Sequence, residues 1–596
     1  MRVVATAGHV DHGKSTLIRA LTGIETDRWA EEKRRGLTID LGFAWTALPS
    51  GQEVSFVDVP GHERFLANTL AGLGPAPIVL LAVAADEGWS AQTDDHRDAI
   101  AALGIGSGVV ALTRADRADE AQRAAAVARV RAELAGTALA DVAVVPVSAV
   151  TGEGMDALRA ALDAVLAAEP APDPAARVRL WIDRAFTISG AGTVVTGTLE
   201  AGSLARGDRL EVQGAEHTGE VVVRGLQSRE QDAERIEPVS RAAVNLRGVP
   251  TGVLTRGDAL VTPGAWRLAA TLDVRRATGG PLDDLPEQAV AHIGTAAVPV
   301  RVRPFGADHA RLVLDRPLPL AVGDRIVLRG SGEHAVLGGV RVLDVDPPAL
   351  DRRGDGTRRA SALAAMPADG DAMLEVSRRG AMREKDLRRA GIAVPDPLPD
   401  ALRRVGTHLV DAAALARWGT TLRSAVEETT ARDPLAPGLP RGAAAAAIGL
   451  PDASLLDAVV AAAGLVSDGG TVRDPDAVRG LGAAEAGIAA LERRLRSHPF
   501  SAPEADDLAA LRLGAKELAA AEGQGRILRL PDGVVLLPTA PALAMRALAA
   551  LPQPFSASQA RQALSTTRRV AIPLLEHLDG RGWTRRVDGT AREVVR

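Results

Sequence analysis

The first part of the chain alternates fully apolar runs with stretches that have the composition of helices. The apolar runs occupy residues 3–7, 54–59, 78–85, 108–113 and 142–149. Segments such as STLIRAL and EAQRAAAVARVRAELA lie between them. Strands that are apolar on both faces and alternate with helices are typical of βαβ units. Residues 1–170 are therefore predicted to form an α/β domain with a mainly parallel sheet.

The hydrophobic pattern changes at AAEPAPDPAA, residues 167–176, which is rich in proline and alanine and is expected to be a linker. From 177 to about 350, short alternating strands are separated by Gly-Asp and Pro turns. Many short strands at turn-separated spacing are typical of β-barrels. The length of this region fits two antiparallel barrels, 177–263 and 264–350.

From about residue 355 the chain is rich in Ala, Leu and Arg and has a weak repeat of roughly 50–60 residues. Each unit is helical and ends in a hairpin-like tail. The four tails are 406–415, 464–475, 525–538 and 580–595. Helices followed by a two-stranded wing predict tandem winged-helix (α+β) domains, and a generic helical bundle is the alternative. The predicted units are 360–428, 429–480, 481–538 and 539–596.

Composition excludes several classes of protein. Cysteine is absent, which excludes a disulfide framework, cysteine-ligated zinc, iron–sulfur clusters and thiol catalysis. Hydrophobic residues make up 46% and charged residues 24%, as in globular rather than disordered chains. The sequence starts without a charged and then apolar leader, and it has no apolar run of about 18 residues. We therefore expect a cytoplasmic protein that does not bind a membrane.

The strongest local signal is GHVDHGKST, directly after an expected strand and before an expected helix. It matches GxxxxGK[ST], in which glycines allow backbone N–H groups to surround a phosphate. Lys14 reaches the β/γ-phosphates and the Ser15 hydroxyl binds Mg²⁺. His9 and His12 could instead bind a metal, but the surrounding phosphate loop and the lack of cysteine argue against it. The nucleotide-binding residues predicted here are Gly8, His9, Val10, Asp11, His12, Gly13, Lys14, Ser15 and Thr16.

Two further segments predict the Mg²⁺ and γ-phosphate contacts. Asp58 and Gly61, in DVPG, follow a strand, where the carboxylate can support Mg²⁺ and the Gly61 N–H can meet a γ-phosphate. Thr38, in RRGLTID, lies in a loop that can close on both. The predicted metal site therefore consists of Ser15, Thr38 and Asp58, and the predicted cofactors are GTP and Mg²⁺.

The preference for guanine is predicted from segments that follow the fourth and fifth strands. Thr113-Arg114-Ala115-Asp116 contains a carboxylate that can accept hydrogen bonds from the guanine N1–H and 2-amino group, which adenine lacks. Ser148-Ala149 can supply a backbone contact to the guanine O6. Each short motif is weak, but five motifs in order at strand ends indicate a GTPase.

Together, GHVDHGKST, RGLTID, DVPGHE and VSA resemble translational GTPases of the elongation factor Tu class. This resemblance implies two β-barrels after the GTPase domain, and it implies that His62 positions the attacking water on the ribosome. Thr113 and Arg114 stand where most GTPases have Asn and Lys. A Thr at this position resembles the selenocysteine-specific elongation factors. Residues 182–202 and 568–586 resemble the start of their second domain and their last winged helix.

The resemblance implies delivery of selenocysteinyl-tRNA to the ribosome at recoded UGA codons. A thiol with a pKa of about 8.5 is mostly protonated at neutral pH, whereas a selenol is more acidic and mostly anionic. A pocket that selects selenolate should therefore supply fixed positive charge. In this family the pocket lies between the GTPase domain and the first barrel. The matching positions are Asp40, Arg184 and Arg241.

The C-terminal segment 539–596 is basic, with nine arginines and four acidic residues, although the whole chain has a net charge of −5. A local basic region on an acidic molecule indicates nucleic-acid binding. The resemblance implies that this segment binds an mRNA hairpin beside the recoded UGA, where Arg side chains can hold unstacked bases. The expected RNA-binding residues are Arg568, Arg569, Arg585 and Arg586.

Two other functions are compatible with parts of the sequence. One is a general aminoacyl-tRNA or initiator-tRNA carrier of the same class, against which the C-terminal tail and Thr113 argue. The other is a winged-helix regulator with a nucleotide-sensing ATPase head. The paired barrels and the combination of RGLTID with DVPGH argue against the regulator.

Overall fold

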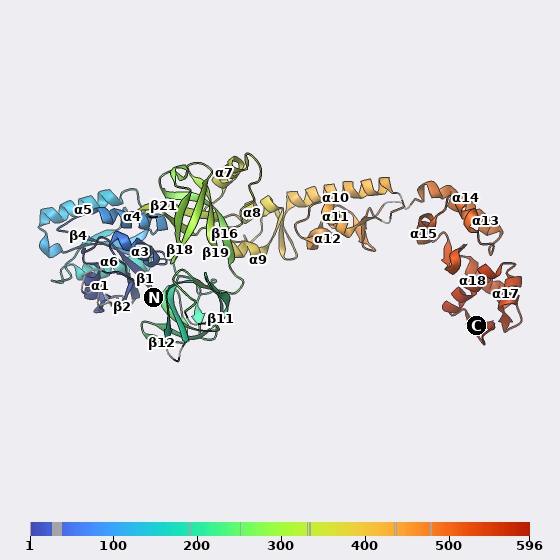
Figure 1. Ribbon diagram of the computed structural model, residues 1–596, viewed down its shortest axis with the longest axis horizontal. Helices are drawn as coiled ribbons and strands as arrows, with labels where there is room; N and C mark the ends of the chain where they lie inside the picture. The colour runs from blue at the N-terminus through green and yellow to red at the C-terminus, as the bar shows by residue number, and fades with distance from the viewer. Residues whose placement is uncertain are drawn as a thin grey trace. The chain divides into compact units, whose positions relative to one another are not determined.

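The computed structural model describes residues 2–595 except 27–37, 477–479 and the single positions 189, 191, 251, 331, 333, 334, 434 and 437. Contacts within the chain divide it into two compact units (Figure 1). The first contains residues 1–378 and 382–399, and the second contains residues 379–381 and 400–596. Each unit has its own hydrophobic cores. Among the described residues, no helix is both long and apolar enough to span a bilayer.

The first unit begins with a sheet that has helices on both faces. Among the described residues the strand order is β2-β3-β1-β4-β5-β6, in which β2 is antiparallel to β3 and the other pairs are parallel. The strands are β1 (Arg2–Ala7), β2 (Gly42–Ala47), β3 (Glu53–Asp58), β4 (Ile78–Ala84), β5 (Ser107–Thr113) and β6 (Ala143–Pro146). The helices are α1 (Lys14–Thr22), α3 (Leu66–Leu73), α4 (Ala91–Leu103), α5 (Glu120–Leu134) and α6 (Met155–Ala168).

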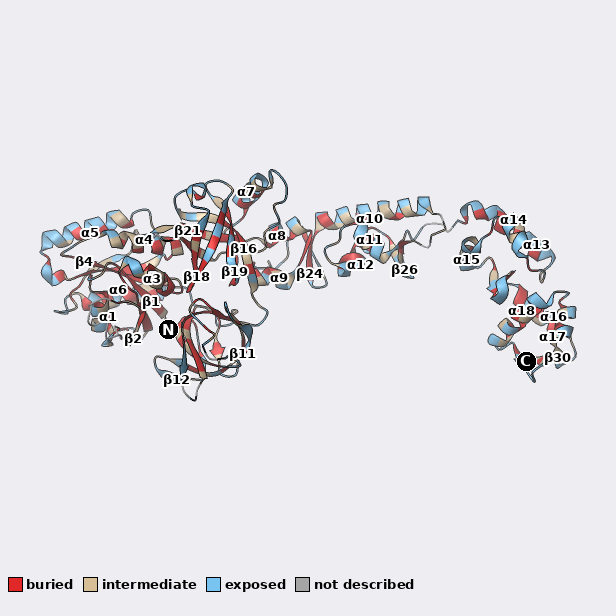
Figure 2. Cartoon of the chain, viewed as in Figure 1, coloured by how far each residue is buried: buried red, intermediate tan, exposed pale blue. Residues whose placement is uncertain are grey.

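The core of this domain forms on both sides of β1, β4 and β5, which coincide with three of the apolar runs. Helices α3, α4 and α5 pack on one face and α1 and α6 on the other. Figure 2 shows these strands buried and the outer helix faces exposed. Since parallel strands end at one edge of the sheet, the loops after β1, β3 and β5 meet there. The α/β prediction is confirmed.

The next two regions are closed antiparallel barrels, as predicted. The first has the order β10-β15-β7-β8-β14-β11 and is closed by pairing of β10 with β11. The second has the order β16-β19-β18-β17-β20-β21 and is closed by pairing of β16 with β21.

The main strands of the first barrel are β7 (Arg179–Ile188), β8 (Gly192–Leu199), β10 (Arg209–Gln213), β11 (Thr218–Ser228), β14 (Ser240–Arg247) and β15 (Ala259–Val261). Those of the second are β16 (Arg267–Gly279), β17 (Gln288–Ile293), β18 (Ala296–Pro304), β19 (His309–Leu320), β20 (Arg325–Gly330) and β21 (Val336–Asp344). The exact domain boundaries stay predictions.

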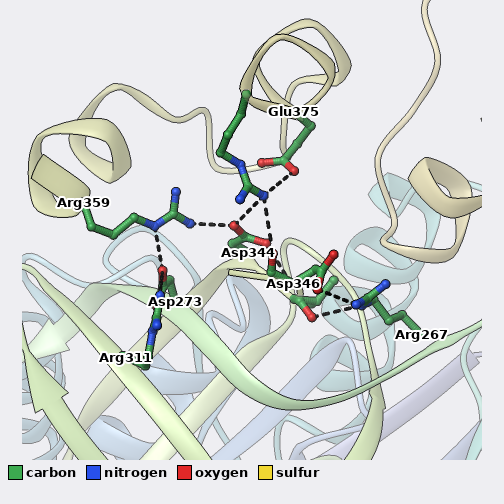
Figure 3. A network of polar contacts seen from close by, with 9 residues as sticks. Arg267, Asp273, Arg311, Asp344, Asp346, Arg359 and Glu375 are labelled. Carbon is green, nitrogen blue, oxygen red and sulfur yellow. Dashed lines mark hydrogen bonds and ion pairs between the residues drawn. The ribbon is translucent and has the colours of Figure 1, made fainter. Parts of the chain in front are cut away.

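A buried network of charges attaches α7 (Asp355–Ala365) and α8 (Ala372–Arg379) to the second barrel (Figure 3). Arg359 of α7 donates to Asp273 at 2.7 Å and to Asp344 at 2.5 Å. Because three arginines balance three carboxylates, each buried charge has a partner, without which burial would be strongly unfavourable. The network consists of Asp273, Arg311, Asp344, Arg359, Glu375 and Arg378.

The second unit repeats short helices followed by two-stranded hairpins, which confirms the winged-helix prediction. Its helices are α10 (Ala412–Arg432), α11 (Arg441–Ala447), α12 (Leu456–Ala462), α13 (Glu485–Ser497), α14 (Ala505–Ala510), α15 (Ala515–Gly523), α16 (Ala540–Ala549), α17 (Ala557–Ala563) and α18 (Arg568–Gly580). The hairpins are β23 (Leu402–Val405) with β24 (His408–Asp411), β26 (Val466–Asp468) with β27 (Thr471–Arg473), β28 (Leu528–Leu530) with β29 (Val534–Leu536), and β31 (Thr584–Arg586) with β32 (Ala591–Val594).

The first hairpin differs from the tail expected at 406–415, because α10 begins within that segment. The Asp411 side chain accepts a hydrogen bond from the Ala414 N–H at 2.7 Å and caps the helix. Leu422 and Val426 of α10 then pack with α11 and α12. The DAAAL sequence therefore starts a helix instead of ending a wing.

Candidate functional site

The phosphate-loop sequence forms a tight turn between β1 and α1. Gly8 has a φ of +124°, and a Cβ there would lie 2.1 Å from the carbonyl oxygen of Ala82, so only glycine fits. Gly13, with a φ of +76°, precedes α1. The buried Lys14 ammonium donates to the carbonyl oxygens of Gly8 at 2.9 Å and His9 at 2.8 Å. The loop backbone and its lysine are thus held together at a helix N-terminus, which favours anions.

A cavity of about 300 Å³ opens at this edge of the sheet and combines most of the predicted nucleotide-binding residues. The predicted residues that line it are Val10, Asp11, Gly13, Lys14, Ser15, Thr16, Thr38, Gly61, Thr113, Arg114, Asp116 and Ala149. Leu17, Arg117 and Val150 also line the cavity. Each directly follows a predicted motif residue, and this adjacency was the sequence signal that could have indicated them. The predicted residues outside the lining are Gly8, His9, His12, Asp58 and Ser148.

Two hydroxyl groups in the cavity lining lie close together, and the buried carboxylate of Asp58 has its own hydroxyl partners. The Ser15 and Thr38 hydroxyls lie 3.1 Å apart. Asp58 is fully buried, and its two oxygens accept hydrogen bonds from Thr6 and Thr26, both at 2.7 Å. Such oxygen donors fit Mg²⁺, which keeps several waters and takes few protein ligands. Sequence reasoning missed Thr6 and Thr26 because no motif contains them. Arg35, Gly36 and Leu37 of the RGLTID motif lie outside the described residues.

Thr113 and Arg114 attach the predicted guanine motif to the phosphate loop. The Thr113 hydroxyl donates to the His12 carbonyl oxygen at 2.7 Å. The Arg114 guanidinium donates to Glu87 at 2.6 Å and also to the Asp11 carbonyl oxygen. The hydrogen bond from Arg114 lowers the pKa of Glu87. Thr and Arg at these positions therefore connect the base side of the cavity to the phosphate side.

Asp116 is exposed to the cavity, and Ser148 orients it. A hydrogen bond from the Ser148 side chain lowers the pKa of Asp116. The buried Ser148 oxygen also accepts hydrogen bonds from the N–H groups of Val150 at 3.3 Å and Thr151 at 3.1 Å. Asp116 is consequently an ionised, oriented acceptor at neutral pH, as recognition of two adjacent guanine N–H groups would require.

His12, one of the two loop histidines, is fully buried. Burial, followed by the charge of His9, lowers the pKa of His12 to about 4. Among the described residues, no group of three or more His, Cys, Asp or Glu could hold a metal ion.

His62 follows DVPG but does not line the cavity. Its Nδ1 accepts a hydrogen bond from the Arg64 N–H at 3.2 Å, so its ring caps the short 3-10 helix η1 (Glu63–Phe65). The ring lies 6.1 Å from that of Phe65. Its predicted catalytic role would need the side chain to turn toward the nucleotide and stays a prediction.

A second cavity, of about 180 Å³, lies between the GTPase-like domain and the first barrel. Arg184 and Arg241 both line it, as predicted, together with Phe43, which sequence reasoning missed. The guanidinium carbon lies 3.9 Å from the Phe43 ring centroid in Arg241 and 5.0 Å in Arg184. Cations over an aromatic face are favourable, so Phe43 holds both arginines in place. Asp40 is outside the lining but accepts from Arg184 at 3.1 Å.

Each arginine at this cavity has a carboxylate partner. Arg241 binds both oxygens of Asp183, and Asp40 accepts from Arg184 and, at 2.6 Å, from Arg256. Burial raises the pKa of Asp40, but the hydrogen bond from Arg256 and the charge of Arg184 outweigh it, so the pKa lies below its usual value. The lining itself carries Arg184, Arg229 and Arg241 and one acidic residue, Glu230, and Glu53 outside the lining pairs with Arg229.

Sequence reasoning did not identify Arg256 as a residue of this site, because its RGD sequence at 256–258 indicates only a turn. Its guanidinium contacts Asp40, the Asp183 carbonyl oxygen at 2.9 Å and the Asn68 side chain at 2.6 Å. Asn68, on α3, donates in turn to the Ile39 carbonyl oxygen at 2.9 Å. Arg256 therefore connects the barrel with the segment after Thr38 and with the helix after DVPG.

The four C-terminal arginines differ in their surroundings. Arg569 donates to the Pro503 carbonyl oxygen at 2.9 Å, so it joins two winged-helix units. Arg585 pairs with Glu593, and Arg586 lies 3.4 Å from Glu576. Arg568, at the start of α18, is exposed and has no ion pair within the described part of the chain.

Comparisons with known proteins agree with this architecture. Residues 1–168 match the elongation factor Tu GTP-binding domain, 274–349 the β-barrel domain of selenocysteine-specific elongation factors, and 546–592 the winged helix of elongation factor SelB. The Escherichia coli K12 selenocysteine-specific elongation factor is 37% identical over 423 residues, 70% of this chain and 68% of that protein. The Desulfomicrobium baculatum factor is 36% identical over 65% of this chain and 63% of its own length. The crystal structure of bacterial EF-Sec is similar over 100% of both chains, with a TM-score of 0.77 and 25% identity.

The fold, the phosphate-loop cavity and the matching GTP-binding domain define a translational GTPase that binds guanine nucleotides. The second barrel and the last winged helix match domains of one family within this class. The chain belongs to the family of selenocysteine-specific elongation factors.

Proposed function

We propose that this GTPase delivers selenocysteinyl-tRNA to the ribosome at recoded UGA codons, guided by an mRNA hairpin that the C-terminal winged helices bind. The observation that carries the proposal is the cavity between the GTPase domain and the first barrel. Arg184 and Arg241 meet there on Phe43, and the lining carries three arginines and one acidic residue. A cavity of about 180 Å³ can hold a small side chain, and its charge favours an anion over a hydroxyl.

The nucleotide site is proposed to act as follows. Lys14 and the loop N–H groups bind the β- and γ-phosphates, and Asp116 with the backbone at Ala149 recognises guanine. Ser15 and Thr38 would hold Mg²⁺, with Asp58 behind them, and the ion would supply neutralisation of phosphate charge. Thr6 and Thr26 orient Asp58 by donating to its two oxygens.

His62 is the proposed positioning group for the attacking water. It lies directly after Gly61, which lines the cavity on its γ-phosphate side. Removing one such group slows hydrolysis by roughly 10²-fold or more in enzymes of this kind. His62 caps the Glu63–Phe65 helix, so its ring must turn away from this helix before it can position the water. Hydrolysis would therefore depend on binding to the ribosome, which would cause this rotation.

The nucleotide state is proposed to control the aminoacyl cavity through Asp40. Asp40 lies two residues after Thr38, whose hydroxyl contacts Ser15 at 3.1 Å. Its carboxylate holds Arg184 and Arg256 of the first barrel. Loss of the γ-phosphate would release Thr38 and with it the carboxylate that orients Arg184. Affinity for the charged tRNA should therefore be far higher with GTP than with GDP.

The proposal for the mRNA hairpin depends on the C-terminal segment. Arg568 is exposed at the N-terminus of α18, and Arg585 and Arg586 are exposed on β31 of the wing. Exposed arginines on a helix and a wing can contact phosphates and stack on unpaired loop bases.

The decisive experiment compares selenocysteinyl-tRNA with seryl-tRNA on the same tRNA body by filter binding, with a GTP analogue present. Hydrogen bonds to a charged group contribute about 1.5–3 kcal/mol each, or roughly 10–100-fold. Arg184→Ala should therefore remove most of the preference, and Arg184→Lys should restore part of it. Arg241→Ala is a poorer test because it leaves the buried Asp183 without its partner. Equal binding of both tRNAs by the wild type would favour a general carrier.

A further inference from the structure

A carboxylate outside the lining of the nucleotide cavity holds one of the residues that line it. Glu87 lies in the turn that follows β4 and is not among the described residues of the lining. Its Oε1 accepts a hydrogen bond from the Arg114 guanidinium at 2.6 Å, and Arg114 does line the cavity. The second oxygen, Oε2, lies 3.7 Å from the His12 Nε2 in the phosphate loop. Glu87 therefore reaches both the guanine side and the phosphate side of the cavity.

Arg114 joins two strained residues, one on each of these loops. Arg114 has a φ of +52° and Asp11 has a φ of +62°, and both residues line the cavity. Left-handed backbone is unfavourable for a residue with a Cβ and persists where the surrounding structure holds it. The Arg114 guanidinium supplies such a contact by donating to the Asp11 carbonyl oxygen. The side chain that pairs with Glu87 thus connects the strained points of the two loops.

The two contacts of Arg114 use the planar shape of its side chain. Nη1 donates to Glu87 while Nη2 donates to Asp11. A guanidinium presents these donors in a fixed fork, so a partner on one nitrogen fixes the direction of the other. Without Glu87, Nη1 would keep the carboxylate of Asp86, which lies 3.6 Å away and is too distant for a hydrogen bond. The orientation of Arg114 toward Asp11 therefore depends on Glu87.

We propose that Glu87 is a positioning residue for the bound guanine nucleotide, which sets the lifetime of the nucleotide by holding Arg114 against the phosphate loop. A nucleotide that extends from the phosphate loop to Asp116 can leave only when the loops on its two sides loosen, and the contacts of Arg114 oppose this loosening. These contacts include no residue that is expected to meet the γ-phosphate, so GDP and GTP should be held alike. The inference rests on the proposed placement of the nucleotide in this cavity and not on the delivery of tRNA.

The dissociation rate of the nucleotide from the full chain tests the proposal. It is measured by displacing fluorescent GDP, or a fluorescent GTP analogue that is not hydrolysed, with excess unlabelled nucleotide. Because Glu87 is half-exposed, Glu87→Ala should raise both rates by roughly 3–10-fold, between the effects of an exposed ion pair and of a buried charge-assisted hydrogen bond. Glu87→Gln, which retains an acceptor but not the charge, should be intermediate.

Glu133→Ala is the matched control. Glu133 pairs with Arg97 at 2.7 Å in the same domain, and neither residue is among the described residues that line the cavity. This variant should therefore release both nucleotides at the wild-type rates. Unchanged rates in Glu87→Ala, or an equal acceleration in Glu133→Ala, would overturn the proposal. An effect of Glu87→Ala on only one of the two nucleotides would also overturn it.

A double variant shows whether Glu87 acts through Arg114. Arg114→Ala should raise the dissociation rates by itself, and adding Glu87→Ala should then have no further effect. If Arg114→Ala binds too weakly to measure, Arg114→Lys serves the same purpose, because a point charge lacks the fork that holds both contacts. The effect of Glu87→Ala should then be smaller than in the wild type. An effect of Glu87→Ala that is equally large with and without the Arg114 change would refute the proposal.

Asp116→Asn tests the underlying placement of the nucleotide separately. Unchanged GTP affinity in that variant would refute the placement of guanine at Asp116, whatever the comparison of Glu87 with Arg114 shows. Weakened GTP affinity in Asp116→Asn together with wild-type dissociation rates in Glu87→Ala would instead retain the placement and remove only the role of Glu87.

Discussion

Arg256, on the first barrel, donates a 2.6 Å hydrogen bond to the carboxylate of Asp40, 216 residues earlier in the chain. The same guanidinium donates to Asn68 on α3. The barrel is thus in direct contact with both segments that are expected to respond to the γ-phosphate. A change at the nucleotide could therefore reach the proposed aminoacyl cavity through Arg256 as well as through the Asp40–Arg184 pair.

Arg256→Ala should reduce the difference between GTP and GDP in the affinity for charged tRNA. Its two side-chain contacts are charge-assisted, so we expect a loss of about 10–100-fold, because Asp40 then orients Arg184 less well. The measurement is the dissociation rate of charged tRNA with each nucleotide. Arg256→Lys, which retains the charge but not the planar fork, should be intermediate. An unchanged GTP-to-GDP ratio would exclude Arg256 from the coupling.

Asp116→Asn should shift nucleotide preference from guanine toward xanthine, because an acceptor pair becomes one donor and one acceptor. The hydrogen bond from Ser148 holds the pKa of Asp116 below its usual value, so the carboxylate is ionised at neutral pH and the change removes an existing charge. Loss of one charge-assisted contact should weaken GTP binding by about 10–100-fold. Equilibrium titration with GTP and xanthosine triphosphate tests this, and unchanged GTP affinity would disprove the guanine assignment.

Arg568 and Arg569 should have different effects on RNA binding. In Arg568→Ala, the slope of log affinity against log salt concentration should become shallower by about 0.7, the value for one lost single-strand phosphate contact. Arg569→Ala should mainly lower stability, because its guanidinium donates to the Pro503 carbonyl oxygen. The assay measures binding of RNA hairpins with randomised loops from 50 to 200 mM salt, alongside thermal unfolding. Identical salt slopes for Arg568→Ala and the wild type would remove Arg568 from the interface.

The last two winged-helix units should fold only together. One hydrophobic core extends from Leu481 to Leu578, and Thr566 donates to the Phe500 carbonyl oxygen at 2.5 Å. A fragment of residues 481–596 should therefore unfold cooperatively, whereas 539–596 alone exposes part of that core and should be mostly unfolded. Circular dichroism with thermal melting distinguishes these outcomes. A cooperative transition in the shorter fragment would contradict the shared core.

Glu200 should make stability depend on pH near neutrality. Burial raises the pKa of Glu200 from 4.5 to about 7, although the positive charge of Arg179 opposes this shift. Because the folded state binds this proton more tightly, the contribution to stability is fully present below pH 4.5 and is lost as pH rises through 7. As the pH rises from 5.5 to 8, the Tm of Glu200→Gln should therefore rise relative to that of the wild type, by on the order of 2–4 °C. A Tm difference that stays constant with pH would show that Glu200 does not titrate there.

The sequence by itself determined the features that depend on neighbours along the chain. The apolar runs predicted β1, β4 and β5, because a strand buried on both faces needs unbroken apolar residues. The phosphate loop was predictable because its turn, its lysine and its hydroxyl lie within one short segment. The hairpin wings were predictable for the same reason, although the helix cap at Asp411 ends the first hairpin earlier than the sequence indicated.

Only the tertiary structure decided which distant residues complete the sites. Thr26 reaches Asp58 across 32 residues, and His96 reaches Gly8 across 88. Thr, His and Arg at these positions carry no local signature, because their contacts are with segments far away in the sequence. The arginine pocket shows both cases, because family resemblance indicated Arg184 and Arg241 but not their neighbours. Asp183 became apparent only when β7 and β14 came together within the barrel, and Phe43 and Arg256 only when the barrel was packed against the GTPase domain. Burial makes each charge need a partner, and the fold, rather than the order of the sequence, supplies that partner.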